Sequence, residues 1–172
     1  MSSAPKTPLN LVPLPGLMEV ASEALFIEFR AELVEAGYGD VRPTHGCVFR
    51  FVHENGMRLT ELAQRAGMTK QSIGEIVDDL EALGYVERVP DPADKRAKLI
   101  RLTEKGRQAQ RVGFGLFTTI EQRWAERYGT ERIAELRELL EEIAATEAPQ
   151  LVPELSQAAR EKIDPAPEPA AA

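Results

Sequence analysis

The sequence has a single cysteine among its 172 residues, so no disulfide can form within the chain. It has no run of about 18 apolar residues, which a transmembrane helix would need. Its first residues lack a basic segment followed by an apolar one, the pattern of a secretory signal peptide. We therefore expect a cytoplasmic protein that does not enter a membrane.

The residue patterns of enzymes and metal sites are also missing. No glycine-rich phosphate loop, nucleophile elbow or pair of carboxylates in an apolar setting occurs in the sequence. The two histidines, His45 and His53, have no carboxylate at ligand spacing, and Cys47 has no partner at metal spacing. We expect no enzymatic activity, no cofactor and no bound metal.

The net charge of -7 argues against a protein that coats nucleic acid through charge alone. The acidic excess is unevenly distributed, however. Residues 56–106 hold nine basic and nine acidic side chains, so the excess lies outside them. Within residues 95–101 every charged side chain is basic: Lys95, Arg96, Lys98 and Arg101. An acidic chain thus carries one basic turn, and its function has to account for it.

Glycine, proline and capping residues divide the chain into short elements. Residues 1–16 contain four prolines and are expected to form a flexible arm. Helical apolar spacing is found in segments 17–36, 43–55, 60–66, 70–83, 103–128 and 130–146. The tail, 147–172, is expected to be partly disordered, with room for a short helix around 153–163. Segments 17–36, 103–128 and 130–146 carry more apolar surface than one small domain needs to bury.

Two short helices joined by a glycine turn and followed by a β-hairpin are typical of a winged helix-turn-helix. Helices 60–66 and 70–83, with Thr60 and Thr69 as expected N-caps, fit this pattern, and strands are expected at 85–89 and 98–102. An apolar stripe fixes the second helix on the core: Ile73, Ile76, Val77, Leu80 and Leu83. The sequence therefore predicts a mainly α (α+β) fold whose opposite helix face points outward.

We expect the first turn of helix 70–83 to contact DNA. Its free backbone N–H groups and the helix dipole attract phosphate, and a glutamine can pair with adenine through two hydrogen bonds. The candidate contact residues are Thr69, Lys70, Gln71, Ser72, Gly74 and Glu75. Glu75 has two interpretations, an acceptor for cytosine or ordinary exposed surface. Together with Asp78 and Asp79 it indicates that only the N-terminal end of the helix enters a groove.

The basic turn is expected to reach the neighbouring minor groove. A narrow minor groove concentrates negative potential and attracts arginine, which suits Arg96. Lys95 and Lys98 are placed to hold the flanking phosphates. Asp94 is expected to orient the guanidinium of Arg96 through a salt bridge across the turn.

Five segments together resemble the MarR (multiple antibiotic resistance regulator) family of winged-helix repressors. They are RLTELA from Arg58, AGMTKQS from Ala66, LGYV from Leu83, DPADKRAK from Asp91 and LTEKG from Leu102. The likeness covers residues 17–146 in element order and 42–106 in motif detail. One position departs from the pattern, because Ala93 stands where many members carry a basic residue. The outer contact of the wing is therefore expected to be weaker or missing.

The resemblance implies a homodimer with a winged helix at about residues 43–103 and dimerisation helices at about 17–36 and 103–146. It implies a transcriptional repressor that binds double-stranded DNA at a pseudo-palindromic operator and is released by a small aromatic or phenolic effector. His45 and Phe49 are candidate effector contacts, although His45 also suits a structural role. Two alternatives stay open: a protein-interaction module without DNA binding, favoured by the acids on helix 70–83, and a redox sensor acting through Cys47.

Overall fold

The computed structural model describes residues 12–53 and 55–149, so the expected helix around 153–163 lies outside the described residues. The elements in chain order are α1 (Leu14–Glu35), η2 (Pro43–His45), α2 (Gly46–Phe51), β1 (Met57–Arg58), α3 (Leu59–Arg65), α4 (Lys70–Ala82), β2 (Val86–Asp91), β3 (Asp94–Leu102), α5 (Glu104–Tyr128) and α6 (Thr130–Glu147). The strands form an antiparallel sheet in the order β1-β3-β2. This is the predicted mainly α winged-helix fold.

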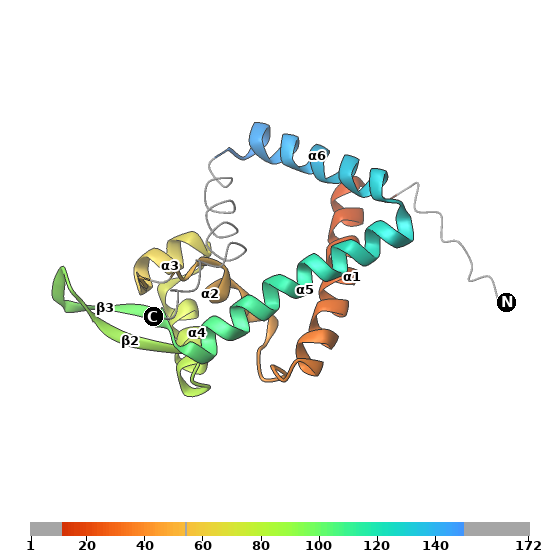
Figure 1. The fold of residues 1–172 in the computed structure, drawn as a ribbon. Coiled ribbons are helices and arrows are strands. Elements are labelled where there is room, and N and C mark those ends of the chain that lie inside the picture. The colour runs from red at the N-terminus through yellow and green to blue at the C-terminus, as the bar shows by residue number, and fades with distance from the viewer. Residues whose placement is uncertain (1–11, 54, 150–172) are drawn as a thin grey trace, which may run out of the picture.

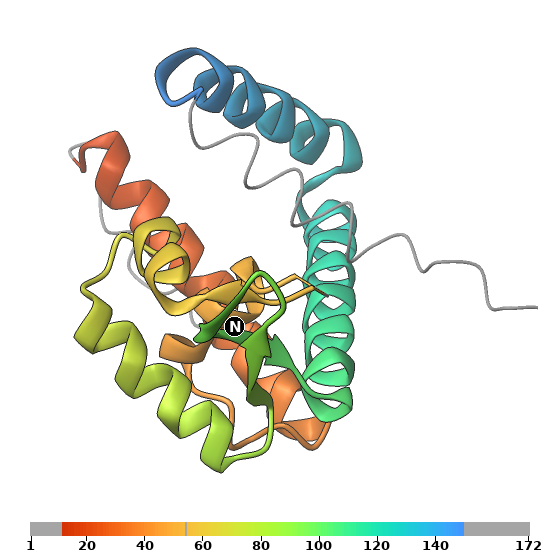
Figure 2. The ribbon, with the colours of Figure 1, turned by 90° about the vertical axis from the view of Figure 1, so that its left-hand side faces the viewer.

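The chain has two parts, which Figure 1 shows separated along the long helix α5. The winged-helix lobe comprises residues 43–103. The helical arm comprises α1, α5 and α6, with α1 packed across α5. In the view of Figure 2, α6 lies at the top and α4 at the lower left of the molecule, with the β2–β3 hairpin in front near the middle.

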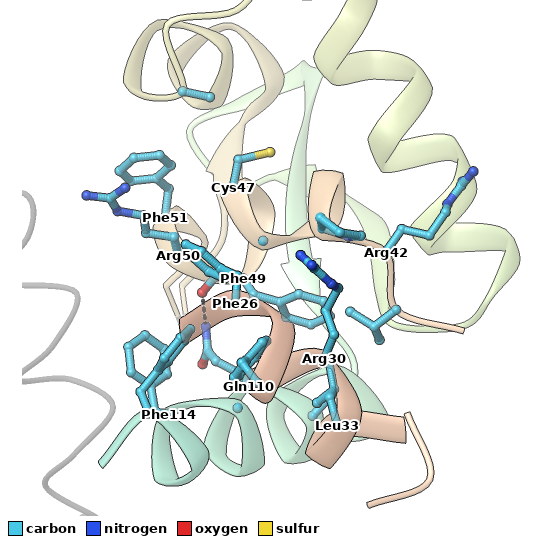
Figure 3. A pocket seen from close by; sticks show the side chains of 18 of the residues that line it. Phe26, Arg30, Leu33, Arg42, Cys47, Phe49, Arg50, Phe51, Gln110 and Phe114 are labelled. Atoms are coloured by element: carbon cyan, nitrogen blue, oxygen red, sulfur yellow. Dashed lines mark hydrogen bonds between the residues drawn. The ribbon is translucent and has the colours of Figure 1, made fainter. Parts of the chain in front are cut away.

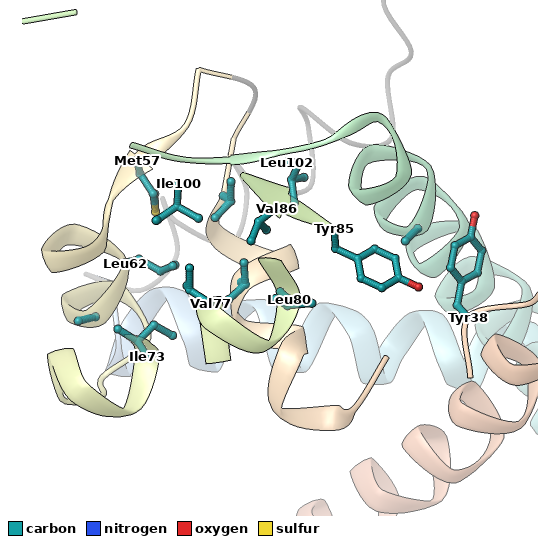
Figure 4. Packing of buried hydrophobic residues seen from close by; sticks show 14 of the residues in the cluster. Tyr38, Met57, Leu62, Ile73, Val77, Leu80, Tyr85, Val86, Ile100 and Leu102 are labelled. Atoms are coloured by element: carbon teal, nitrogen blue, oxygen red, sulfur yellow. The ribbon is translucent and has the colours of Figure 1, made fainter. Parts of the chain in front are cut away.

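The apolar stripe of α4 forms the centre of the lobe core, as predicted. Ile73, Val77 and Leu80 are completely buried, whereas Ile76 is only half-buried. They pack with side chains of α3 and the sheet and with Tyr85, which directly precedes β2; Leu62 of α3 and Tyr85 are both fully buried (Figure 4). Burying one such side chain contributes about 1.5–3 kcal/mol. The stripe therefore sets which face of α4 remains outside.

Two threonines cap the helices that frame the lobe. Thr69 Oγ1 accepts a hydrogen bond from the Ser72 N–H, and Thr103 Oγ1 accepts one from the Gly106 N–H, both at 3.1 Å. The first turn of α5 lies so close to the sheet that a Cβ at Gly106 would be 2.0 Å from the Tyr85 carbonyl oxygen. This approach explains physically why LTEKG ends in glycine.

The predicted boundary of the second helix is wrong. The segment predicted as one helix over 43–55 is a 3-10 turn, η2, followed by α2, which ends at Phe51. Val52 is already extended, and Gln110 from α5 donates to the Phe49 carbonyl at 2.6 Å and more weakly to that of Val52. A side chain from a distant helix thus satisfies carbonyls that a longer helix would have used internally.

Thr60 is not an N-cap, contrary to the prediction. α3 begins at Leu59 with Arg58 as its N-cap residue. Met57 and Arg58 pair with Ile100 and Leu99 as the short strand β1, which the sequence analysis missed. The hairpin strands extend further toward the turn than predicted, with β2 ending at Asp91 and β3 beginning at Asp94.

Candidate DNA-binding interface

The first turn of α4 presents several of the predicted contact residues on the surface. Lys70 and Gln71 are exposed and Ser72 is half-buried, while Thr69 is held by its cap and by a 2.8 Å contact with the Ser72 hydroxyl. Gln71 Nε2 donates to Glu75 Oε1 at 3.3 Å. Glu75 therefore orients Gln71 in this structure, a role that neither interpretation of Glu75 included.

Gly74 lies partly under the neighbouring helix. It is half-buried, and a Cβ at this position would meet only the Leu59 side chain of α3, at 3.9 Å. The protein itself therefore has room for a methyl group here. The lack of a side chain at Gly74 therefore affects only how closely another molecule can approach α4 from outside.

Two of the three acids that argued against groove entry, Asp78 and Asp79, are paired with arginines from outside α4. Arg88 of β2 donates to Asp78 at 2.5 Å and also to Glu81. Asp79 accepts hydrogen bonds from Arg42 and from His45. The hydrogen bond from Arg42 lowers the pKa of Asp79, so this carboxylate is ionised and matched by a cation. The C-terminal half of α4 is thus less repulsive to phosphate than its sequence suggests.

The turn of the wing is fixed by a buried carboxylate. Asp91 accepts hydrogen bonds from Arg58 Nε and Nη2 at 2.8 and 2.5 Å and from the Ala93 N–H at 2.8 Å. The Ala93 N–H and the Arg58 guanidinium both lower the pKa of Asp91. Arg58 comes from β1, so this bond ties the turn between β2 and β3 to the start of α3. Neither Arg58 nor Asp91 was predicted to support the interface.

Asp94 makes a different contact from the one expected. Its Oδ1 accepts a hydrogen bond from the backbone N–H of Arg96 at 3.0 Å, and its Oδ2 lies 3.9 Å from Arg58 Nη2. Asp94 therefore shapes the backbone of the turn and does not contact the guanidinium of Arg96. Lys95, Arg96 and Lys98 are exposed, and within the described part of the chain no ion pair involves them. Figure 1 shows this hairpin projecting away from the helices.

A cavity of about 770 Å³ lies between the arm and the lobe, bordered by α1, α2 and α5 (Figure 3). Six phenylalanines line it: Phe26, Phe29, Phe49, Phe51, Phe114 and Phe117. Four arginines, Arg30, Arg42, Arg50 and Arg65, border it, against one acid, Glu23. The volume suits a small organic ligand. The predicted effector contact Phe49 belongs to this lining.

His45, the other predicted effector contact, lies behind the cavity wall. Its side chain is fully buried, Nδ1 accepts from the Arg42 backbone N–H at 3.1 Å, and Nε2 is 2.6 Å from Asp79 Oδ2. Burial lowers the pKa of His45, although Asp79 acts in the opposite direction. The neutral ring with its proton on Nε2 satisfies both contacts. The structural role weighed for His45 is therefore the one that the geometry supports.

Cys47 also borders the cavity, but its surroundings disfavour a thiolate. Its Sγ donates to the Thr44 carbonyl at 3.2 Å, and burial raises the pKa of the thiol. A reactive cysteine needs the opposite shift. The geometry therefore gives the redox hypothesis no support.

Residues 12–53 and 55–149 contain neither a cluster of metal ligands nor a membrane-spanning helix. No group of three or more histidine, cysteine, aspartate and glutamate side chains in these residues could hold a metal ion. Among the helices there, none is long and apolar enough to cross a bilayer.

Comparison with known proteins finds winged-helix regulators. Residues 40–97 match the model of the MarR family. The regulator FarR of Neisseria gonorrhoeae is 31% identical over 140 residues, which cover 77% of this chain and 88% of FarR. The activator ExpG of Rhizobium meliloti (strain 1021) is 34% identical over 95 residues, 55% of this chain but only 49% of ExpG, so that match spans about half of the relative.

Among solved structures, the repressor CouR bound to a 23-mer DNA duplex is similar with a TM-score of 0.63 and 25% identity. The likeness covers 83% of this chain and 99% of CouR. The relatives are thus regulators of transcription, and one of them is seen on DNA.

Proposed function

Because this chain belongs to the MarR family of DNA-binding transcriptional regulators, we propose that it is a homodimeric repressor of a pseudo-palindromic operator. A small-molecule effector in the cavity between arm and lobe releases it. One combination of features carries this proposal. The hairpin tip is exposed and basic, and Asp78 and Asp79 of α4 already form ion pairs with arginines of the same chain.

The proposed DNA contacts divide between two elements. On α4, Lys70 and Ser72 bind phosphate near the helix N-terminus and Gln71, held by Glu75, reads a base edge. On the wing, Arg96 enters the minor groove, and Lys95 and Lys98 bind the flanking phosphates. Thr69, Gly74 and Asp94 act indirectly, through the cap, the open surface beside α3 and the shape of the turn.

The dimer is supported by apolar side chains that the arm leaves exposed. On α6 these are Leu136, Leu139, Leu140 and Ile143, and on α1 they include Leu14, Met18, Val20, Ile27 and Val34. Contiguous exposed apolar surface of this kind marks an interaction site. A second copy of the arm covers it, and two-fold symmetry then presents two α4 helices to successive turns of DNA.

The test is selection of bound sites from a random oligonucleotide pool, followed by titration of the recovered site at several salt concentrations. Replacement of Arg96 by alanine is expected to weaken binding by about 1–3 kcal/mol. Arg111→Ala, on α5, removes an equal charge outside the wing and serves as the control. Unchanged affinity and salt slope in the Arg96 variant would refute the role of the wing. No retardation of any oligonucleotide at low salt would favour the protein-interaction module.

A further inference from the structure

The outer face of α4 offers few side chains that can reach a base pair. Gln71, Glu75 and Asp78 follow one another at helical spacing and are exposed, and Ser72 beside them is half-buried. Asp78 is already bound to Arg88 at 2.5 Å, and the Ser72 hydroxyl lies 2.8 Å from that of the capping threonine. Of these four side chains on α4, Gln71 and Glu75 therefore remain for the bases.

These two side chains are joined by a hydrogen bond, in which Gln71 Nε2 donates to Glu75 Oε1 at 3.3 Å. An ionised carboxylate only accepts hydrogen bonds, so the contact fixes which end of the amide faces it. One N–H of the amide is then occupied, which leaves its other N–H and its carbonyl oxygen for a base. We propose that the two side chains act as one unit that reads neighbouring base pairs, an adenine at Gln71 and a cytosine at Glu75. This inference rests on the proposed function and adds to it the bases that α4 selects.

The groups that remain on Gln71 match adenine. The major-groove edge of adenine presents the acceptor N7 beside the N6 amino donor, so one N–H and one carbonyl oxygen satisfy both. Guanine presents two acceptors there, N7 and O6. Gln71 would have to donate both of its N–H groups to guanine, and one of them is bound to Glu75. The contact between the two side chains therefore selects adenine against guanine.

The Glu75 carboxylate determines the neighbouring base. Stacked base pairs are about 3.4 Å apart along the duplex, so two groups 3.3 Å apart can each face one of two adjacent pairs. A carboxylate accepts from the N4 amino group of cytosine, which has an acceptor on one side only. The N6 amino group of adenine lies between two acceptors, N7 of its own base and O4 of thymine, and these repel a carboxylate. Cytosine is therefore the base that suits Glu75.

The charge of Glu75 makes the pair more selective than a neutral contact would be. A carboxylate close to the duplex repels phosphate whatever the sequence, and the hydrogen bond from cytosine offsets part of this repulsion. Glu75 therefore weakens binding to wrong sequences more than binding to the right one. Its removal should raise the affinity for random DNA and lower the discrimination between bases.

The experiment is selection of bound duplexes from a random pool by the full chain and by variants of α4. The variants are Gln71→Ala, Glu75→Ala and Glu75→Gln, and both residues are exposed, so that the core stays intact. The position that Gln71 reads is the one whose base preference disappears in Gln71→Ala. Lys70→Ala provides the contrast, because loss of a phosphate contact should weaken binding to all sequences alike and reduce the salt slope.

The wild type is expected to prefer adenine over guanine about tenfold at this position and cytosine at the next. Glu75→Ala should reduce the adenine preference to about threefold, abolish the cytosine preference and bind random DNA more tightly. Glu75→Gln should restore the adenine preference, because its amide oxygen can still accept from Gln71. An unchanged adenine preference in Glu75→Ala overturns the coupling of the two side chains. Guanine or thymine in place of the cytosine overturns the role of Glu75.

A base analogue tests the same contact from the DNA side. 7-Deazaadenine lacks the N7 acceptor but pairs normally with thymine, so it should weaken binding of the wild type about fivefold and leave Gln71→Ala unaffected. The same analogue at an adenine outside both contacts is the control. An equal loss in the wild type and in Gln71→Ala would mean that the shape of the duplex is read there, which overturns the inference.

The proposed function and this inference can fail separately. If the wild type retained no oligonucleotide, the proposed function would fail, and the base reading with it. If the wild type selected a site and Arg96→Ala weakened binding to it, but Gln71→Ala left every base preference unchanged, only the present inference would fail.

Discussion

The winged-helix lobe and the helical arm treat their apolar side chains very differently. In the lobe, Ile73, Val77 and Leu80 of the α4 stripe are completely buried, and Asp78 and Asp79 of the same helix are matched by arginines of the same chain. In the arm, α6 has no buried residue, and its leucines are between 41% and 53% exposed. The lobe therefore completes its core within one chain, whereas the arm leaves an apolar face that a single chain does not cover.

The arm does have contacts of its own, which lie between α1 and α5. Phe26 and Phe117 meet edge to face, Arg123 forms a salt bridge with Glu28 at 3.0 Å, and the Trp124 indole donates to Glu28. These contacts align the two helices but do not reach the outer face of α6. The lobe therefore depends on close packing within one chain, whereas the proposed dimer would cover the apolar face of the arm.

The largest expected effect tests the packing of the lobe. Gly106→Ala places a methyl group against the Tyr85 carbonyl, where 2.0 Å is available, and we expect a loss of about 3 kcal/mol in the free energy of unfolding. Chemical denaturation measures it. Gly115→Ala on the same helix is the control, because nothing lies within 4 Å of its Cβ. It should gain about 0.5–1 kcal/mol from helix propensity. Equal stability of both variants would contradict the close approach.

The next effect tests the arm. Leu139→Glu puts a charge in the middle of the exposed apolar face of α6 and is expected to weaken the proposed dimer by roughly 100-fold, since an unpaired buried charge costs several kcal/mol. Sedimentation equilibrium gives the dissociation constant. Glu138→Gln changes the opposite side of the same helix turn and should leave it unchanged. A dimer as tight as the wild type in Leu139→Glu would place the interface elsewhere.

The contrast also explains which features could be read from the sequence. The cap at Thr69, the stripe of α4 and the hairpin depend on local spacing, so their pattern can be recognised in the sequence. The support of the interface is not local. Arg58 reaches Asp91 across 33 residues and Arg42 reaches Asp79 across 37. No periodicity connects such pairs, and only the fold brings them together.

Two site assignments failed for reasons of local geometry. His45 and Phe49 were both candidate effector contacts, within the one helix that was expected over 43–55. The 3-10 turn before α2 directs His45 inward instead, to Asp79. Asp94 was predicted to contact the guanidinium of Arg96, whereas it contacts the backbone N–H of that residue. An aspartate two residues before a backbone N–H commonly accepts from it, and this signal could have indicated the observed contact.

A smaller effect tests the ion pairs between Arg88 and the acids of α4. We expect them to favour DNA binding and to have no effect on the proposed dimer. Arg88→Gln frees Asp78 and Glu81 on α4, and we expect about fivefold weaker operator binding at low salt, because two carboxylates then act on nearby phosphates. The difference should shrink at high salt, where charges are screened. Arg107→Gln, which breaks a pair within α5, is the control. Dimerisation should be unaffected in both variants. Weaker dimerisation of Arg88→Gln would contradict the division of DNA binding and dimerisation between lobe and arm.

The smallest expected effect is a pH dependence confined to the lobe, since both histidines of the chain lie outside the arm. Burial lowers the pKa of His45, so the unfolded chain binds its proton at a higher pH than the folded chain does. Its contribution to stability is therefore complete above the unfolded value of about 6.5 and declines as the pH falls below it. One proton limits the slope to about 1.4 kcal/mol per pH unit. The ring faces Asp79 and the Arg42 N–H, and the lowered pKa of Asp79 places the titration of that carboxylate below this window.

Urea denaturation between pH 7 and pH 5 should show the decline in the wild type and a flatter profile in His45→Gln, while the dimer dissociation constant stays constant over the same range. Parallel profiles in the two proteins would mean that His45 takes up its proton over the same pH range in the folded lobe as in the unfolded chain. The neutral ring between Arg42 and Asp79 would then be the wrong description of how α4 is attached.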